Sequence, residues 1–237
     1  MADDKVQISA RDWKSHPPYV HLPYTSTKLR GPKRPLVLTP QTISELSGPV
    51  YGQNDLDPLD SDLTKNAAMN GEPLGERIIV EGTVFDEGGR PVPNTLLEVW
   101  QANSAGRYVH KRDQHHAPLD PNFYGAGRCV TDANGRYRFV SIKPGPYPWK
   151  NHHNAWRPAH IHFSLFGPSF LTRLVTQMYF PGDPLLAYDP IFHGVPEESA
   201  RKRLISKFSL DITEPGEATG YRFDIWLRGR KATPMEE

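Results

Sequence analysis

Two histidines separated by one residue offer the clearest chemistry in this sequence. His160 and His162 lie in a short run whose pattern predicts a β-strand. Side chains two positions apart on a strand point to the same face, so the two imidazoles would converge. The opposite face would carry apolar residues that can enter a core: Ala159, Ile161, Phe163 and Leu165. Converging imidazoles are half of a metal site, although a His-x-His pair also occurs on the solvent face of ordinary strands.

The rest of the sequence limits which metal such a site could hold. No Asp or Glu lies at helical spacing from the histidines, so neither an HExxH motif nor an obvious two-histidine, one-carboxylate site is present. Cys129 is the only cysteine, which excludes thiolate zinc sites, iron–sulfur clusters and disulfides within one chain. Tyrosinate remains as the anionic ligand. Because a phenol has a pKa of about 10, a tyrosinate ligand favours a strongly Lewis-acidic ion such as Fe(III).

Tyr147 lies on a loop that is stiff enough to aim its side chain. Prolines at positions 144, 146 and 148 fix φ and bias the residues before them toward extended conformations. This loop precedes the histidine run, which opens with Arg157 and Pro158. The sequence therefore brings a phenol, a guanidinium and two imidazoles into one region of the chain.

The elements that would position these residues are mainly strands. Alternating and apolar runs predict strands at 77–85, 95–101, 136–142, 174–180 and 221–227. Helices are predicted only at 40–46, after Thr39 as N-cap, and at 197–208. The expected fold is all-β, an antiparallel β-sandwich with long loops, a proline-rich N-terminal arm, one or two short helices and the metal loops at one end. We expect residues 1–75 to be an arm that packs on a partner subunit and residues 76–237 to be the catalytic β-sandwich domain.

Composition agrees with a single loop-rich β domain. The chain has 237 residues, 37% of them hydrophobic, with 24 prolines and 19 glycines. A formal net charge of +1 gives no electrostatic reason to expect binding to nucleic acid or to an anionic membrane. No apolar run approaches the roughly 18 residues of a spanning helix, and the N-terminus lacks the apolar segment of a signal peptide. A cytoplasmic protein is expected.

Several motifs, in order along the chain, resemble those of the intradiol ring-cleaving dioxygenases. The resemblance runs from about Tyr24 to Gly229 and is strongest to the β subunits of the members that cleave protocatechuate. It is carried by residues 76–80, 94–103, 106–108, 120–123, 127–132, 142–149, 156–163 and 221–229. The resemblance implies a non-haem Fe(III) cofactor with four protein ligands: Tyr108, Tyr147, His160 and His162.

The resemblance also implies roles around the metal. Arg157 would lie beside the substrate ring and stabilise anionic charge, and Gln177 would hydrogen-bond near the ligands. Tyr147 would be displaced by substrate and take up a substrate proton. The implied substrate-binding residues are Tyr24 near the substrate carboxylate and Trp149 and Ile191 as pocket wall. The implied reaction cleaves protocatechuate with O2 to 3-carboxy-cis,cis-muconate in a hetero-oligomer with a homologous α subunit.

Other interpretations compete with this one. Catechol and hydroxyquinol 1,2-dioxygenases carry an N-terminal helical dimerisation region, which residues 1–75 do not resemble. A transthyretin-like binding module would suit the turn-rich segments 82–93 and 131–137 but has no need of the ligand set, and the α subunit lacks the iron ligands. Two adjacent histidine pairs are interpreted as solvated loop residues: His115 with His116, and His152 with His153.

Overall fold

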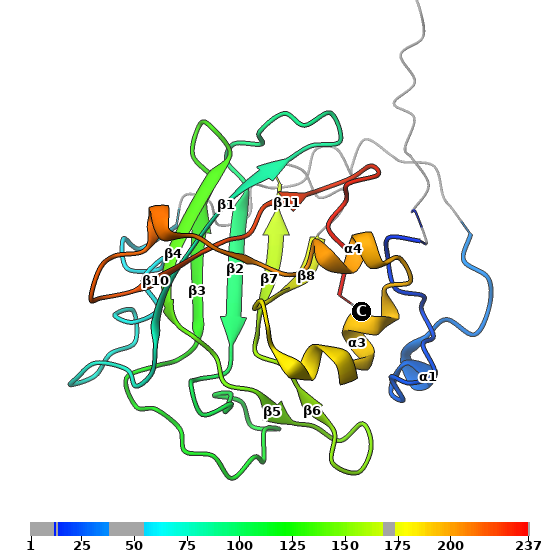
Figure 1. The fold of residues 1–237 in the computed structure, drawn as a ribbon, viewed down its shortest axis with the longest axis horizontal. Coiled ribbons are helices and arrows are strands. Elements are labelled where there is room, and N and C mark those ends of the chain that lie inside the picture. The colour runs from blue at the N-terminus through cyan, green and yellow to red at the C-terminus, as the bar shows by residue number, and fades with distance from the viewer. Residues whose placement is uncertain (1–11, 13, 38–54, 168–173, 237) are drawn as a thin grey trace, which may run out of the picture.

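The computed structural model describes residues 12, 14–37, 55–167 and 174–236. Within these ranges the regular structure is mostly extended and the helices are short (Figure 1). The strands are β1 (Arg77–Phe85), β2 (Leu96–Gln101), β3 (Ala126–Val130), β4 (Arg136–Ile142), β5 (Tyr147–Pro148), β6 (Trp156–Arg157), β7 (His160–Phe166), β8 (Leu174–Tyr179), β9 (Lys207–Phe208), β10 (Thr219–Arg222) and β11 (Ile225–Trp226). The helices are α1 (Thr27–Arg30), α3 (Pro190–Gly194) and α4 (Glu198–Lys202), with 3-10 turns η1 (Pro184–Tyr188) and η2 (Leu210–Ile212).

Two sheets form the body of the described structure. In the first, β1 pairs antiparallel with β4 and parallel with β10 and β11, and β9 pairs antiparallel with β10. The second has the order β3-β2-β7-β8, with every neighbouring pair antiparallel. A small ribbon of β5 and β6 lies at one end, and α3 and α4 lie to one side of the sheets (Figure 1). The predicted β-sandwich is confirmed.

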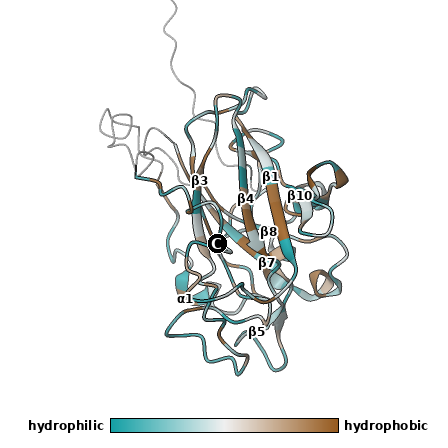
Figure 2. Cartoon of the chain, turned by 90° about the vertical axis from the view of Figure 1, so that its left-hand side faces the viewer, coloured by the Kyte–Doolittle hydropathy of each residue, from teal (hydrophilic) through white to brown (hydrophobic). Residues whose placement is uncertain are grey.

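Side chains from both sheets meet in one hydrophobic core. The rings of Phe139 on β4 and Phe163 on β7 lie with centroids 5.8 Å apart. Figure 2 shows hydrophobic segments in β1 and β4, while much of the surrounding loop is hydrophilic. Cys129 lies in this core, and burial raises the pKa of its thiol to about 12, as expected of a packing residue. The apolar face predicted for the histidine strand is confirmed, since all its members belong to the core: Ala159, Ile161, Phe163 and Leu165.

The first sheet is mixed rather than fully antiparallel. After β8 the chain passes through the short helices and β9 before it returns beside β1. This connection lets the chain return in the same direction as β1, so β10 and β11 both pair with β1 in parallel. Long connections make parallel pairing possible, whereas hairpins give only antiparallel pairs.

The strand predicted over 221–227 is divided into β10 and β11. Between them, the backbone N–H of Phe223 donates to the carbonyl of Glu81 at 2.8 Å. The carboxylate of Asp224 then accepts from the backbone N–H of Thr83 at 2.9 Å. A side chain thus takes a donor that a continuous strand would have paired with backbone, and this interrupts the ladder.

The helix predicted over 197–208 is wrong in length, because α4 covers only Glu198–Lys202. Beyond it, the backbone N–H of Tyr179 donates to the carbonyl of Leu204 at 2.8 Å, and the N–H of Ser206 donates to the carbonyl of Tyr179 at 2.9 Å. Since these groups pair with the end of β8, they cannot continue a helix. The helix predicted over 40–46 lies outside the described residues.

Segments that precede β1 pack on the sandwich of the same chain. Leu63 is fully buried in the core, and its N–H donates to the carbonyl of Val140 at 2.9 Å. Nearer the N-terminus, the side-chain oxygen of Asn151 accepts from the N–H of Thr25 at 2.9 Å. Packing of this arm on a partner subunit stays a prediction.

Among the described residues, no helix has the length and apolar character needed to cross a membrane.

Candidate metal centre

Strand β7 presents both histidines on one face. In the β7–β8 ladder His160 lies opposite Tyr179 and His162 opposite Gln177, and the two imidazole centroids are 4.8 Å apart. On the other side, Trp100 of β2 lies opposite His162 with its ring stacked at 4.8 Å and 3°. Pairing with strands on both sides therefore holds the imidazoles in place.

Each imidazole has one nitrogen occupied by a protein acceptor. The Nδ1 atom of His160 lies 2.7 Å from the carbonyl oxygen of Pro158, and Nδ1 of His162 lies 2.8 Å from a carboxylate oxygen of Glu236. Because both partners accept, each Nδ1 carries a proton, while Nε2 of His160 faces Arg157 and Nε2 of His162 faces the Tyr108 hydroxyl. Burial, the charge of Arg157 and the neighbouring His162 hold the pKa of His160 well below its usual value. A neutral imidazole with a free Nε2 is the form that binds a metal.

Two tyrosines complete the cluster. The Tyr108 hydroxyl lies 3.2 Å from Nε2 of His162, and the Tyr147 ring lies 5.3 Å from the Tyr108 ring and 5.5 Å from that of His160. The two tyrosine loops approach closely at Gly106, whose φ is +77° and where a Cβ would lie 2.1 Å from the carbonyl oxygen of Pro146. Only glycine fits that conformation and that contact. The four predicted metal ligands are therefore neighbours in space.

Burial disfavours the phenolate form of both tyrosines. Burial raises the pKa of Tyr108 well above its usual value, and the neighbouring Tyr147 adds to this rise. Burial also raises the pKa of Tyr147, although Arg157 opposes the rise. Deprotonation of either phenol at neutral pH therefore requires a strong positive charge beside it.

Arg157 is buried in a network of acceptors. Three oxygens surround its Nη2 atom: Gln177 Oε1 at 2.6 Å, the Tyr179 hydroxyl at 2.9 Å and Asp189 Oδ2 at 2.9 Å. Its Nη1 lies 3.3 Å from Nε2 of His160, and its buried Nε has no hydrogen-bond partner among the described residues. Although burial disfavours the charged form, Tyr179 and Asp189 raise the pKa of Arg157, which stays cationic. A cation whose Nε donor has no partner among the described residues thus lies beside the histidines.

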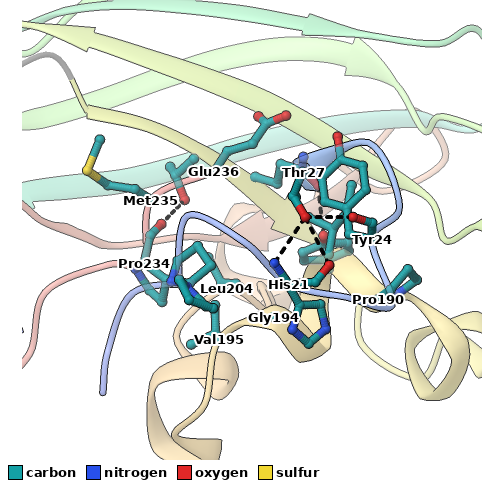
Figure 3. Close-up of a pocket in the computed structure, with 16 residues that line it drawn as sticks. His21, Tyr24, Thr27, Pro190, Gly194, Val195, Leu204, Pro234, Met235 and Glu236 are labelled. Carbon is teal, nitrogen blue, oxygen red and sulfur yellow. Dashed lines mark hydrogen bonds between the residues drawn. The ribbon is translucent and has the colours of Figure 1, made fainter. Parts of the chain in front are cut away.

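The residues predicted to bind substrate lie around the cluster in two pockets. Trp149 lines one together with Tyr108 and Tyr147, and its ring lies 5.7 Å from the Arg157 guanidinium carbon. Tyr24 and Ile191 line the other, which also contains Gln177, Tyr179 and Glu236 (Figure 3). The rings of Tyr24 and Trp149, one from each pocket, meet edge to face at 5.3 Å.

Sequence reasoning missed three residues of this site: Tyr179, Asp189 and Glu236. Tyr179 lies two positions after Gln177 on β8, so strand alternation could have indicated it. Asp189 precedes Pro190, a common helix N-cap signal, but nothing in the sequence links it to Arg157. Glu236 gives no local signal, because its contact with His162 spans 74 positions.

Of the two adjacent histidine pairs, His115 and His116 line the pocket that also contains Tyr108 and Tyr147. His116, His152 and His153 are exposed, as expected of solvated loop residues. His115 is half-buried, with its ring against that of Trp156 at 6.1 Å. Within the described ranges, no group of three or more His, Cys, Asp or Glu side chains could hold a metal ion. The cluster with two phenols is therefore the candidate centre.

Comparison with known proteins gives matches along almost the whole chain. The family described as "Dioxygenase" matches residues 46–229, and that described as "Protocatechuate 3,4-dioxygenase beta subunit N terminal" matches residues 9–42. A protocatechuate 3,4-dioxygenase beta chain from Burkholderia cepacia is 70% identical over 234 residues, covering 99% of each chain.

More distant relatives extend the comparison. The protocatechuate 3,4-dioxygenase alpha chain of Burkholderia cepacia is 32% identical over 162 residues, covering 67% of this chain and 76% of the relative. The solved dioxygenase domain of a carbohydrate-binding fusion protein from a Streptomyces species superposes with a TM-score of 0.50 at 26% identity. That superposition covers 76% of this chain and 93% of the solved domain.

Proposed function

We propose, from the premise that this chain belongs to the intradiol dioxygenase family, that it is an iron-bearing β subunit that cleaves the ring of protocatechuate with O2. The product would be 3-carboxy-cis,cis-muconate. The observation that carries this proposal is the convergence of two imidazoles and two phenols beside a buried arginine. A non-catalytic binding module of the same fold has no need of that combination.

The donor set fits Fe(III). The ligands would be Nε2 of His160 and His162 and the phenol oxygens of Tyr108 and Tyr147. Two anionic oxygens and two nitrogens suit a hard trivalent ion, and the raised phenol pKa values require a strong Lewis acid. When bound, the ion would keep phenols and catechol hydroxyls deprotonated at neutral pH and would activate the ring towards O2.

The chain's own residues would supply a cation and a proton acceptor. The Arg157 guanidinium would offer Nε to an anionic ring oxygen, and its fixed position means that no reorganisation is needed as charge develops. Burial raises the pKa of Tyr147, so its phenolate would be a strong base for a proton from a substrate hydroxyl. Stacking on Trp100 and the hydrogen bond from Glu236 would hold His162 in orientation during these steps.

The ring carboxylate of the substrate would lie near the N-terminal segment. Tyr24 offers a hydroxyl beside Trp149, and the guanidinium carbon of Arg30 lies 4.9 Å from the centre of the Tyr24 ring. A donor and a positive charge at one position suit a carboxylate. The carboxylate end of protocatechuate would lie here, with Trp149 as a wall of one pocket and Ile191 as a wall of the other.

A homologous α subunit would be the partner. The Burkholderia relatives carry the names of an alpha and a beta chain, and this chain resembles both. Residues 1–75 would contact the α subunit in addition to their own sandwich, and 76–237 would form the catalytic domain. Co-expression with a tagged α chain, compared with expression of this chain alone, tests the assembly. We expect this chain to co-purify with the α chain, and full activity of a homo-oligomer of this chain would contradict the proposal.

The visible absorption spectrum tests the proposed cofactor and substrate together. Charge transfer from tyrosinate to Fe(III) should give the purified protein a broad visible band and a red-brown colour. Anaerobic protocatechuate should shift that band, because the catecholate replaces one tyrosinate. A colourless protein that is fully loaded with zinc would contradict the ligand assignment.

Glu236→Gln should weaken iron binding without preventing it. The carboxylate fixes the proton on Nδ1 of His162 and makes Nε2 more basic, and loss of such an outer partner typically costs about 10- to 100-fold in metal affinity. Titration with a competing chelator measures the change. Glu217→Gln, at a solvent-exposed glutamate, is the matched control. Equal chelator resistance in both variants would show that Glu236 does not orient the ligand.

Tyr24→Phe should reduce the preference for protocatechuate over catechol while leaving iron content unchanged. A site built to pair a carboxylate leaves polar groups unmatched when catechol binds. Loss of one such donor should therefore reduce the difference in kcat/KM between protocatechuate and catechol. The ratio of kcat/KM values for the two substrates measures the effect. A wild-type preference for catechol would instead favour the catechol 1,2-dioxygenase alternative.

A further inference from the structure

One buried carboxylate joins the arginine of the site to a helix. Asp189 is fully buried, and its Oδ2 accepts from Nη2 of Arg157 at 2.9 Å. Its Oδ1 accepts from the backbone N–H of Ile191 at 3.1 Å, which makes Asp189 the N-cap of α3. The two oxygens of one side chain thus have different partners, on two elements of the chain.

The contact with Arg157 fixes one end of the guanidinium. The two side chains are 3% and 0% exposed, and an isolated charge at such a depth is costly unless an opposite charge compensates it. Asp189 is the anionic member among the acceptors around Nη2, whereas Gln177 and Tyr179 are neutral dipoles. Because Nη2 is fully engaged on this side and Nη1 contacts His160, Nε is the donor left for the substrate.

The contact with α3 fixes a second part of the pocket. Ile191 lies two residues after Asp189 and lines the pocket that contains Gln177 and Tyr24. Its backbone N–H is held by the same carboxylate that holds Arg157. A shift of either element would therefore move the other.

We propose that Asp189 is a positioning residue, which sets the guanidinium of Arg157 and the start of α3 in one fixed arrangement around the substrate. The inference rests on the proposed function, because it assigns to Arg157 the task of meeting an anionic ring oxygen. Asp189 does not touch the substrate itself; it acts through Arg157 and through the backbone at Ile191.

Asp189→Asn separates the charge of the side chain from its capping role. Asparagine is as good an N-cap as aspartate, so α3 should keep its start while the ion pair with Arg157 is lost. We expect unchanged iron content and an unchanged resting visible band. Affinity for anaerobic protocatechuate, measured by the band shift, and kcat/KM should each fall by about tenfold or more, the size of coupling seen within one hydrogen-bond network. Asp62→Asn is the matched control, since Asp62 also accepts from a backbone N–H two positions on but pairs with exposed Lys65.

A double-mutant cycle distinguishes positioning from general support of the fold. If Asp189 acts through Arg157, Asp189→Asn should cause no further loss of turnover in an Arg157→Ala background, and it should raise the melting temperature there by removing an uncompensated charge. The same loss of turnover in both backgrounds, or wild-type kcat/KM in Asp189→Asn, would overturn the proposal. If the wild-type protein itself binds no iron, the proposed function fails, but the melting temperatures still report whether the two residues are coupled.

Discussion

His162→Ala is expected to yield a protein that folds but purifies with little iron and no visible band. His162 supplies one of the two imidazole nitrogens, and its removal also leaves the Glu236 carboxylate without its partner in the site. Burial pushes the pKa of Glu236 upward, but His162, together with Arg157 and Gln177, keeps the pKa below its usual value. Loss of a direct ligand should cost more than the roughly 100-fold in metal affinity that loss of an outer partner can cost.

Elemental analysis together with the visible spectrum measures this result. His152→Ala is the matched control, because His152 is exposed on a loop and should not affect iron content. If His162→Ala retained stoichiometric iron with an unchanged band, the ligand set would have to be reassigned.

Arg157→Ala is expected to keep iron and colour but to lose turnover by about 100- to 1,000-fold, the range seen when one preorganised donor to developing charge is removed. The guanidinium is not a proposed ligand, and its Nε donor, which has no partner among the described residues, is what the substrate would meet. Single-turnover kinetics with bound substrate would separate the chemical step from binding.

A loss of turnover in Arg157→Ala could also come from a loss of folding. Breaking a buried ion pair typically destabilises a protein by about 3–5 kcal/mol, so this variant is assayed on its soluble, iron-loaded fraction, and two further variants serve as controls. Arg157→Lys keeps the charge but not the planar fork, and should recover only part of the lost turnover. Arg128→Ala removes a partly exposed ion pair with Asp60 and should leave turnover unchanged. Near-normal turnover in Arg157→Ala would make Arg157 a structural residue.

Much of the fold could be predicted because alternation along a strand is a local property. The bounds predicted for β1 and β4 are those observed, and the apolar face of β7 enters the core as expected. Predictions were poorest where a residue distant in the sequence forms a hydrogen bond with a backbone group of the predicted element. Pairing of Ser206 with Tyr179 ends the predicted helix early, and Asp224 interrupts the last predicted strand by capturing the N–H of Thr83.

The sequence by itself determined the types and faces of the chemical groups: two imidazoles on one side of a strand, a phenol on a proline-stiffened loop and an arginine before the strand. Only the tertiary structure decided what holds them. Glu236 reaches His162 across 74 positions and Asp189 reaches Arg157 across 32. Neither contact leaves a periodic or local signal, because a carboxylate finds its partner only after the sheets have packed. The burial of the imidazoles and phenols likewise exists only in the folded chain. The pKa shifts that make the site fit a metal follow from that burial.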